Sequence, residues 1–214
     1  MSKRDFSIHR RALLVTGVSA LTLSACSGII GPPEPPPLYM LKGSALPTSG
    51  GPRVPWQLSI VLPESADSLD TNRIALVQPG DQMDYYANSS WQDRLPFLVQ
   101  SALIEAFEGS GRIAGVGRDT EGLKSQYLLE TDIRDFQARY DVADGVPTAV
   151  VRIAAKLIAA RGRTIAQSFI AHSEVAASQN SVPSAVLAFN QALTATLGQI
   201  VDWALSAPAP VRAE

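Results

Sequence analysis

Apolar residues that alternate with polar ones predict a sheet in the first half of the chain. A period of two is typical of strands, because successive side chains of a strand point to opposite faces. The alternation covers the segments 38–41, 56–62, 73–77, 83–87 and 113–116. In segment 56–62 it assigns one buried face to Trp56, Leu58, Ile60 and Leu62. The turn residues at 78–81 predict that the two flanking segments pair as a hairpin.

Three longer alternating segments follow at 127–140, 149–159 and 164–175. Their short connections predict antiparallel neighbours, and hence a meander. In the first segment the apolar face changes from odd to even residue numbers near Arg134 and Asp135. Because a shift of one residue exchanges the two faces of a strand, we expect a β-bulge there.

Two segments have the three- and four-residue spacing of amphipathic helices. Residues 88–109 contain the first, with Asp93 and Pro96 near its start and Gly109-Ser110-Gly111 ending it. The second begins near Ser181 and runs to about Leu205. Two helices and about seven strands predict an α+β domain, or a three-layer α/β/α domain, with a mixed, largely antiparallel sheet over residues 38–206 and a flexible tail at 207–214.

The N-terminal segment has the features of an export signal. A basic stretch precedes a short apolar run at 12–20, and the run ends in Leu23-Ser24-Ala25-Cys26. This ending resembles the lipobox of bacterial lipoproteins. The resemblance implies that residues 1–25 are a signal peptide and that Cys26 carries acyl chains at the mature N-terminus. An ordinary signal cut near Ala25 is the alternative, and Arg10-Arg11 also allows twin-arginine export.

Residues 26–37 read as a lipidated N-terminus followed by a tether. The proline-rich sequence at 32–37 favours an extended polyproline II conformation, which makes the tether stiff. Ser27 stands where lipoproteins retained in the inner membrane of many Gram-negative bacteria carry Asp, and this resemblance favours the outer membrane. We therefore expect a lipid-anchored protein on the periplasmic side of the cell envelope.

Composition excludes several classes of function. The formal net charge is −2 at pH 7, and the leader accounts for Lys3, Arg4, Arg10 and Arg11, so the mature chain is acidic and a nucleic-acid partner is not expected. Cys26 is the only cysteine. His172 is the only histidine outside the leader, and the strand pattern places it with Ser168 and Glu174 on a solvated face opposite Ile165 and Phe169. We expect no catalytic residues, no metal site and no cofactor.

Residues 84–96, Asp-Tyr-Tyr-Ala-Asn-Ser-Ser-Trp-Gln-Asp-Arg-Leu-Pro, resemble a signature of the ABC-type transport auxiliary lipoprotein family, which includes the paraquat-inducible protein C lipoproteins. The resemblance extends to Phe107-Glu108-Gly109-Ser110-Gly111 after the first helix, to Tyr39 and Leu41, to Tyr127-Leu128-Leu129, and to Trp203 in the last helix. It covers essentially the whole mature chain.

The resemblance implies a non-enzymatic accessory of an MCE-type ABC transporter that moves lipids between membranes. The implied partners are a substrate-binding MCE protein, a permease and an ATPase, with the membrane reached through the acyl chains on Cys26. The implied fold resembles the N-terminal domain of the Tol-system protein B, a mixed sheet with helices on its faces. The alternatives are a periplasmic lipid-binding carrier and an envelope-assembly adaptor.

Tyr85, Tyr86, Trp91 and Arg94 are the candidate partner-binding residues. Aromatic residues before a helix pack as core in many proteins, but aromatics beside Arg94 also suit an interface anchor. Both interpretations stay open at the level of sequence. The sequence also leaves open whether the protein forms a homo-oligomer.

Overall fold

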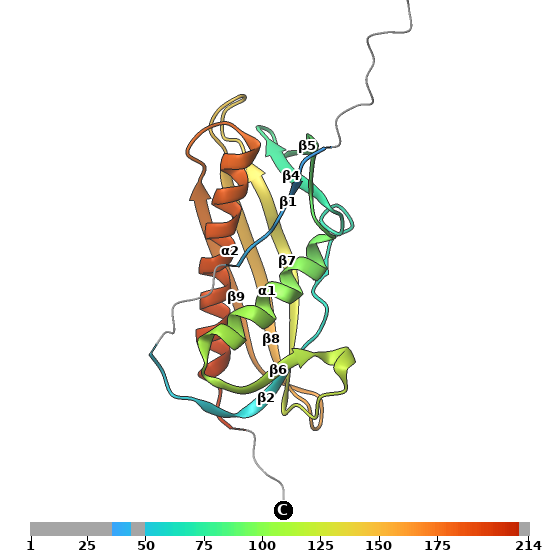
Figure 1. Cartoon of the computed structure of the whole chain (residues 1–214), viewed down its shortest axis with the longest axis vertical. Helices are drawn as coiled ribbons and strands as arrows, with labels where there is room; N and C mark the ends of the chain where they lie inside the picture. Colours follow the sequence, from blue (N-terminus) through green and yellow to red (C-terminus); the bar gives the residue numbers. More distant parts are fainter. Residues whose placement is uncertain (1–35, 44–49, 210–214) are drawn as a thin grey trace, which may run out of the picture. The chain divides into compact units, whose positions relative to one another are not determined.

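The sheet is built around strand β7 (Tyr127–Arg139), as Figure 1 shows. In the computed structural model, which describes residues 36–43 and 50–209, one edge of β7 pairs along its whole length with β8 (Thr148–Ala159), antiparallel. The opposite edge pairs in succession, and in parallel, with β2, β3 and β4. Three short segments of the N-terminal half are therefore joined through one long strand.

Within the described residues the sheet has nine strands, slightly more than the sequence predicted. Strand β2 (Val54–Ile60) continues to β6 (Ile113–Arg118), in parallel. Strand β4 (Arg73–Gln78) forms the predicted hairpin with β5 (Gln82–Trp91), which pairs in turn with the short β1 (Leu38–Tyr39). The remaining short strand is β3 (Glu64–Ser65).

The predicted meander is confirmed, because β9 (Thr164–Ala176) pairs antiparallel with β8. The predicted bulge is confirmed too, as the β7–β8 register shifts between Ile133 and Asp135. A second, unpredicted shift brings Ile165 opposite Ile158. Directly paired residues share a face of the sheet. Ile165 therefore lies on the same open face as His172, and the predicted opposite placement is wrong.

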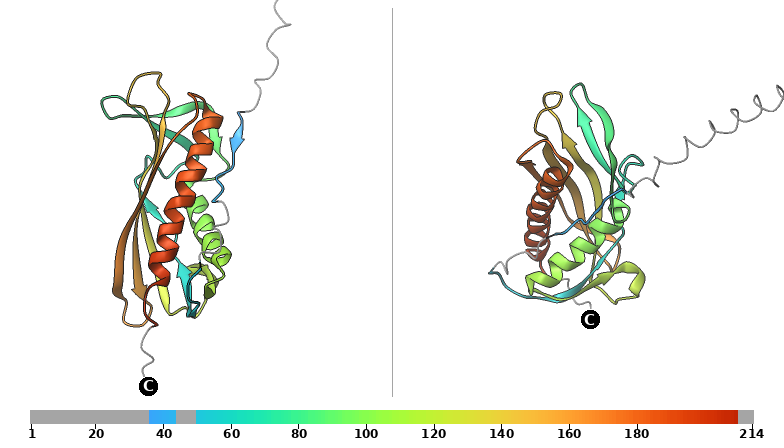
Figure 2. Two further views of the ribbon diagram at one scale, coloured as in Figure 1. Left: turned by 90° about the vertical axis from the view of Figure 1, so that its left-hand side faces the viewer. Right: turned by 45° about the horizontal axis from the view of Figure 1, so that its top comes forward.

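Both helices cover one face of the sheet, as the left view of Figure 2 shows. Helix α2 (Val182–Leu205) packs on β8 and β9, α1 (Leu95–Ser110) packs near β2 and β6, and the two helices contact each other. The fold is α+β with two layers. The three-layer alternative, and the expectation of helices on both faces, are not what the chain adopts.

The first helix begins later than the sequence suggested. Residues 88–91 belong to β5, where Asn88 has a φ of 52° and the Trp91 backbone N–H donates to the Asn72 carbonyl at 2.7 Å. The helix then starts at Leu95, with Pro96 in its first turn, where a missing N–H costs nothing. Asp93 lies before the helix and accepts the Arg94 backbone N–H at 2.7 Å. Helix α1 ends at Ser110, and Gly111, with a φ of 63°, caps it within the predicted Gly109-Ser110-Gly111 stop.

The second helix begins as predicted. The Ser181 side chain accepts the Ser184 backbone N–H and caps the helix. Between the helices and the sheet, Trp91 makes edge contacts with Phe136 and Phe189, and these two rings stack at 5.1 Å between centroids. The expected signal peptide, Cys26 and the tether up to residue 35 lie outside the described residues, as do residues 210–214 of the tail.

Candidate functional site

Trp91 is a core residue. Its side chain is only 1% exposed, and its ring contacts Phe136 from β7 and Phe189 from α2. Strand β5 turns the indole inward because it is bulged opposite the Arg73–Ala75 step of β4. In this conformation Trp91 offers no surface to a partner.

Tyr85 and Tyr86 are half-buried, and both hydroxyl groups have intramolecular partners. The Tyr85 hydroxyl donates to the Ser68 carbonyl at 2.9 Å, and the Arg73 guanidinium lies 3.8 Å from the centre of its ring. The Tyr86 and Tyr140 hydroxyl oxygens are 2.9 Å apart. Burial raises the pKa of Tyr86, and the hydrogen bond to Tyr140 raises it further. The hydroxyl contacts of both tyrosines therefore hold β5 in place, and the raised pKa keeps Tyr86 neutral.

Arg94 lies on the surface at the start of α1. Its side chain, 52% exposed, forms an ion pair with Asp70, and its Nε donates to Asp70 Oδ1 at 3.0 Å. The guanidinium carbon is also 5.6 Å from the centre of the Phe97 ring. Arg94 also borders a surface hollow.

That hollow has a volume of about 280 Å³ and lies between the β2–β3 connection and the first turn of α1. Leu62, Pro63, Pro96 and Phe97 supply its apolar part, and Arg94, Asp70, Glu64 and Ser65 supply its polar part. Leu62 and Phe97 are each 39% exposed. The prediction that Leu62 is buried with Trp56, Leu58 and Ile60 is wrong, because β2 ends at Ile60 and the chain then crosses to β3.

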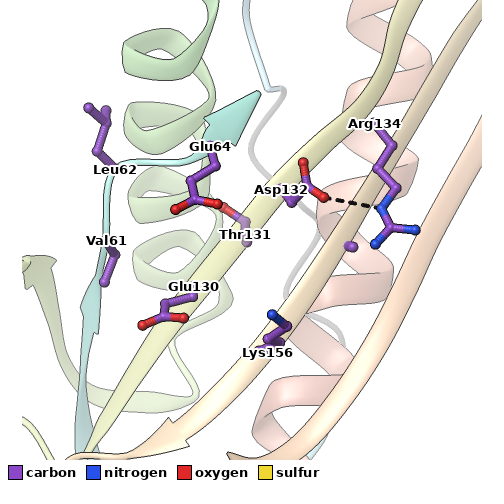
Figure 3. A pocket seen from close by; sticks show the side chains of 9 residues that line it. Val61, Leu62, Glu64, Glu130, Thr131, Asp132, Arg134 and Lys156 are labelled. Atoms are coloured by element: carbon purple, nitrogen blue, oxygen red, sulfur yellow. Dashed lines mark hydrogen bonds and ion pairs between the residues drawn. The ribbon is translucent and has the colours of Figure 1, made fainter. Parts of the chain in front are cut away.

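Two further hollows adjoin this one. The first, of about 430 Å³, shares Phe97 and extends along α1 past Asp93, Gln100, Ser101 and Glu105 to Arg118. The second, of about 200 Å³, shares Leu62 and Glu64 and opens on the free face of the sheet, where Figure 3 shows Glu130, Lys156 and the Asp132–Arg134 ion pair. We call the two hollows that share Phe97 the α1 groove.

Phe97 was missed by the sequence-based interpretation, although the sequence contains a signal for it. The buried side of α1 is formed by Leu95, Leu98, Val99, Ala102, Leu103, Ala106 and Phe107. At 100° per residue, Phe97 lies about 175° from the middle of this stripe, on the side that also carries Ser101 and Glu108. A large aromatic residue on the solvent side of an otherwise regular amphipathic helix is the feature that marks the groove.

His172 is placed on the open face of β9. Its Nε2 lies 3.3 Å from Glu174 Oε1, and its backbone N–H and carbonyl both bond to the Gln199 side chain of α2. Glu174 in turn receives two hydrogen bonds from Arg139, of 3.0 and 2.8 Å. No cluster of metal-ligating side chains occurs within residues 36–43 and 50–209. Nor is any helix in that part of the chain long and apolar enough to cross a membrane.

The described residues thus form an α+β domain with a filled core and a set of open surface hollows. The chain belongs to the family of ABC-type transport auxiliary lipoprotein components, whose family model matches residues 39–201. Membership makes it an auxiliary lipoprotein of an ABC-type transport system, associated with the cell envelope.

Solved structures agree with this fold. The crystal structure of protein XCC0632 from Xanthomonas campestris is 27% identical, has a TM-score of 0.68, and aligns over 79% of this chain and 92% of that one. A crystal structure described as an uncharacterized protein is 16% identical with a TM-score of 0.60, over 72% of this chain and 94% of that one, and shows a likeness of fold alone.

A curated relative is the uncharacterized protein bll6063 of Bradyrhizobium diazoefficiens, 27% identical over 150 residues. The match covers 70% of this chain but 40% of the relative, so the chain spans less than half of that protein's length.

Proposed function

We propose that this protein is a lipid-anchored, non-catalytic adaptor that holds the periplasmic MCE component of an ABC lipid transporter beside a membrane. Acyl chains on Cys26 attach it, the sequence at Ser27 favours the outer membrane, and the permease and ATPase of the same system supply the transport cycle. The observation that carries the proposal is the family match over the folded domain, joined to a surface groove and a filled core.

Anchoring by lipid is energetically sufficient. Each buried methylene contributes about 0.8 kcal/mol, so two or three acyl chains hold a protein at a membrane indefinitely, whereas one chain binds only marginally. A folded domain on such an anchor needs no spanning helix to stay at the envelope.

The alternative of a lipid carrier is disfavoured by the hollows. Sites that enclose a lipid-sized ligand are concave, mostly apolar and commonly about 300–1,000 Å³. The largest of the hollows described here, about 430 Å³, is open and lined by Gln92, Asp93, Gln100, Glu105 and Arg118 among others. Its polar lining would leave acyl methylenes facing charges.

An enzyme is disfavoured by the surroundings of His172. A general base needs a nucleophile or a bound substrate within hydrogen-bond reach. His172 instead contacts Glu174, whose carboxylate is already held by Arg139, on an open strand face.

Co-purification from solubilised envelopes tests the adaptor proposal. A C-terminally tagged full-length chain is expected to recover an MCE-domain protein, and native mass spectrometry of the purified chain is expected to show no bound phospholipid beyond the covalent acyl groups. Stoichiometric phospholipid without an MCE protein would instead support the carrier. If neither an MCE-domain protein nor stoichiometric phospholipid is recovered, the adaptor proposal and the carrier alternative both lose their support.

A further inference from the structure

The α1 groove has an apolar centre that the fold leaves uncovered. Leu62 and Phe97 line the same hollow, flanked by Pro63 and Pro96, and each of the two large side chains is 39% exposed. Most other large apolar side chains of β2 and α1 are buried. An exposed aromatic ring beside an arginine has the composition of an interface hot spot.

Hydrogen bonds within the fold hold the walls of the groove together. The buried Gln100 side chain donates to the Ile60 carbonyl at 3.0 Å and ties α1 to the end of β2. The Leu95 backbone N–H donates to the Thr71 carbonyl at 3.1 Å, and Arg94 pairs with Asp70. A preorganised surface loses little conformational entropy on binding.

Charge around the apolar centre is unbalanced. The two hollows that share Phe97 contain four carboxylates, Glu64, Asp70, Asp93 and Glu105, and two guanidinium groups, Arg94 and Arg118. Both cations are engaged: Arg94 with Asp70, and Arg118 with Ser101 Oγ at 3.1 Å and Glu121 at 3.7 Å. Within the described part of the chain, Glu64, Asp93 and Glu105 form no ion pair.

We propose that the α1 groove docks a segment of the transporter's periplasmic partner that presents an apolar side chain between Lys or Arg residues. The inference rests on the proposed adaptor function and specifies its contact. The apolar side chain packs on Phe97 and Leu62, while its basic neighbours face the carboxylates of Glu64, Asp93 and Glu105. Such complementarity raises the association rate and excludes wrong partners.

The same charges argue against two other occupants. Anionic lipid headgroups would meet three unpaired carboxylates and be repelled. A second copy docked groove to groove by a two-fold axis would bring these carboxylates against their own equivalents. A basic segment of a different protein is the occupant that the charges favour.

Photocrosslinking in the cells that produce the protein tests the contact. The full-length chain carries p-benzoylphenylalanine at position 97 or, as control, at Leu187, which is 62% exposed on α2 and lines none of the three hollows. We expect an adduct at position 97 to a different envelope protein, and mass spectrometry is expected to find Lys or Arg beside the modified residue. A self-adduct, a lipid adduct, a partner peptide without basic residues, or a yield no higher than that of the control would each overturn the proposal.

A matched pair of glutamates on α1 tests the charge requirement. Glu105 lines the groove, whereas Glu108 is equally on the exposed side of α1 but lines none of the three hollows. Since an exposed ion pair contributes up to about 1 kcal/mol, Glu105→Lys is expected to lower the crosslink yield at position 97 about threefold or more, and Glu108→Lys to leave it unchanged. Equal yields from the two variants would contradict the basic partner.

The experiments distinguish a failure of the adaptor proposal from a failure of the groove as its contact. If an MCE protein co-purifies with the unmodified chain but position 97 gives no adduct to it, the adaptor function stands and the groove is not its contact. If no MCE protein co-purifies, the adaptor function fails whatever position 97 contacts.

Discussion

Trp91 and Phe97 are six positions apart in the sequence, yet Trp91 is buried in the core and Phe97 is exposed on the surface. Trp91 closes β5 and joins the aromatic contacts of the core, whereas Phe97 stands on the outer side of α1 beside Arg94. The three residues between β5 and α1 produce this difference, because they turn the chain from an inward-facing strand end to the first turn of a helix.

Truncation separates the two roles. Trp91→Ala is expected to lower the free energy of unfolding by about 3–5 kcal/mol, since it empties a packed core site. Phe97→Ala is expected to lower it by less than about 1 kcal/mol. Urea unfolding of the two purified variants measures both values. Comparable losses for the two would show that Phe97 is structural.

Part of this arrangement could be predicted from the sequence. The sequence indicated Arg94 as a candidate partner-binding residue, but it did not decide between a core and a surface position for Trp91, because an indole beside charged residues suits either place. Only the bulge in β5 decides the direction of the ring, and a bulge of several residues leaves no clear period in the sequence. Leu62 was misplaced because alternation continues past Ile60, where the pairing of β2 ends.

At the level of elements, β9 is an edge strand, and a side chain of α2 bonds to part of its unpaired backbone edge. The Gln199 side-chain amide accepts the His172 N–H at 3.2 Å and donates to the His172 carbonyl at 3.0 Å. It thus occupies two of the outward-facing backbone groups that a further strand would use. Exposed edges of this length invite pairing with other chains.

Removing this amide is expected to promote self-association. Gln199→Ala frees the backbone groups of His172, and sedimentation velocity is expected to show a concentration-dependent increase in mass. Gln191→Ala, an exposed glutamine on the same helix, is the control. If both variants sediment as the parent does, the edge is protected by something else.

The open face of the meander carries a pH-dependent ion pair. Hydrogen bonds from Arg139 lower the pKa of Glu174 below its ordinary value of 4.5, and the nearby His172 lowers it slightly more. A carboxyl with a lowered folded pKa stabilises fully above the unfolded pKa, and this stabilisation is lost as the pH falls through the folded value.

Glu174→Gln is therefore expected to destabilise at pH 7, and its difference from the parent is expected to be smaller at pH 3, below the ordinary pKa of 4.5. The loss at pH 7 stays below about 1 kcal/mol, because both side chains are more than a third exposed, at 38% and 37%. Urea midpoints at the two pH values measure it, with Glu108→Gln as control. A difference as large at pH 3 as at pH 7 would mean that packing, not charge, is lost.

Strands and helices with a regular hydrophobic period could be predicted from the sequence. The strands with which they pair could be predicted less well. The meander, the bulge near Arg134 and the cap at Ser181 follow from local patterns. The parallel pairing of β2, β3 and β4 on one edge of β7 does not, since no local signal selects a strand so distant in sequence. The same holds for both helices lying on one face.

At the scale of the whole molecule, anchoring is the prediction that matters most. If Cys26 bears the acyl chains, Cys26→Ser is expected to leave the protein unlipidated and to prevent its recovery with washed membranes. Fractionation and intact mass measure this, and Ser27→Ala, which leaves the thiol in place, is the control for processing. A Cys26→Ser protein that stays fully with the membranes would point to attachment by another route.

The position of β7 also governs how the chain must fold. Residues before 127 make β2, β3 and β4, but the strand that unites them is synthesised later. A nascent or truncated chain that stops short of β7 leaves these three segments without their common neighbour and their apolar faces in water. The fold therefore has a high contact order, and the sheet cannot be completed until most of the chain has been made. This order of synthesis is compatible with the export that the N-terminal sequence predicts.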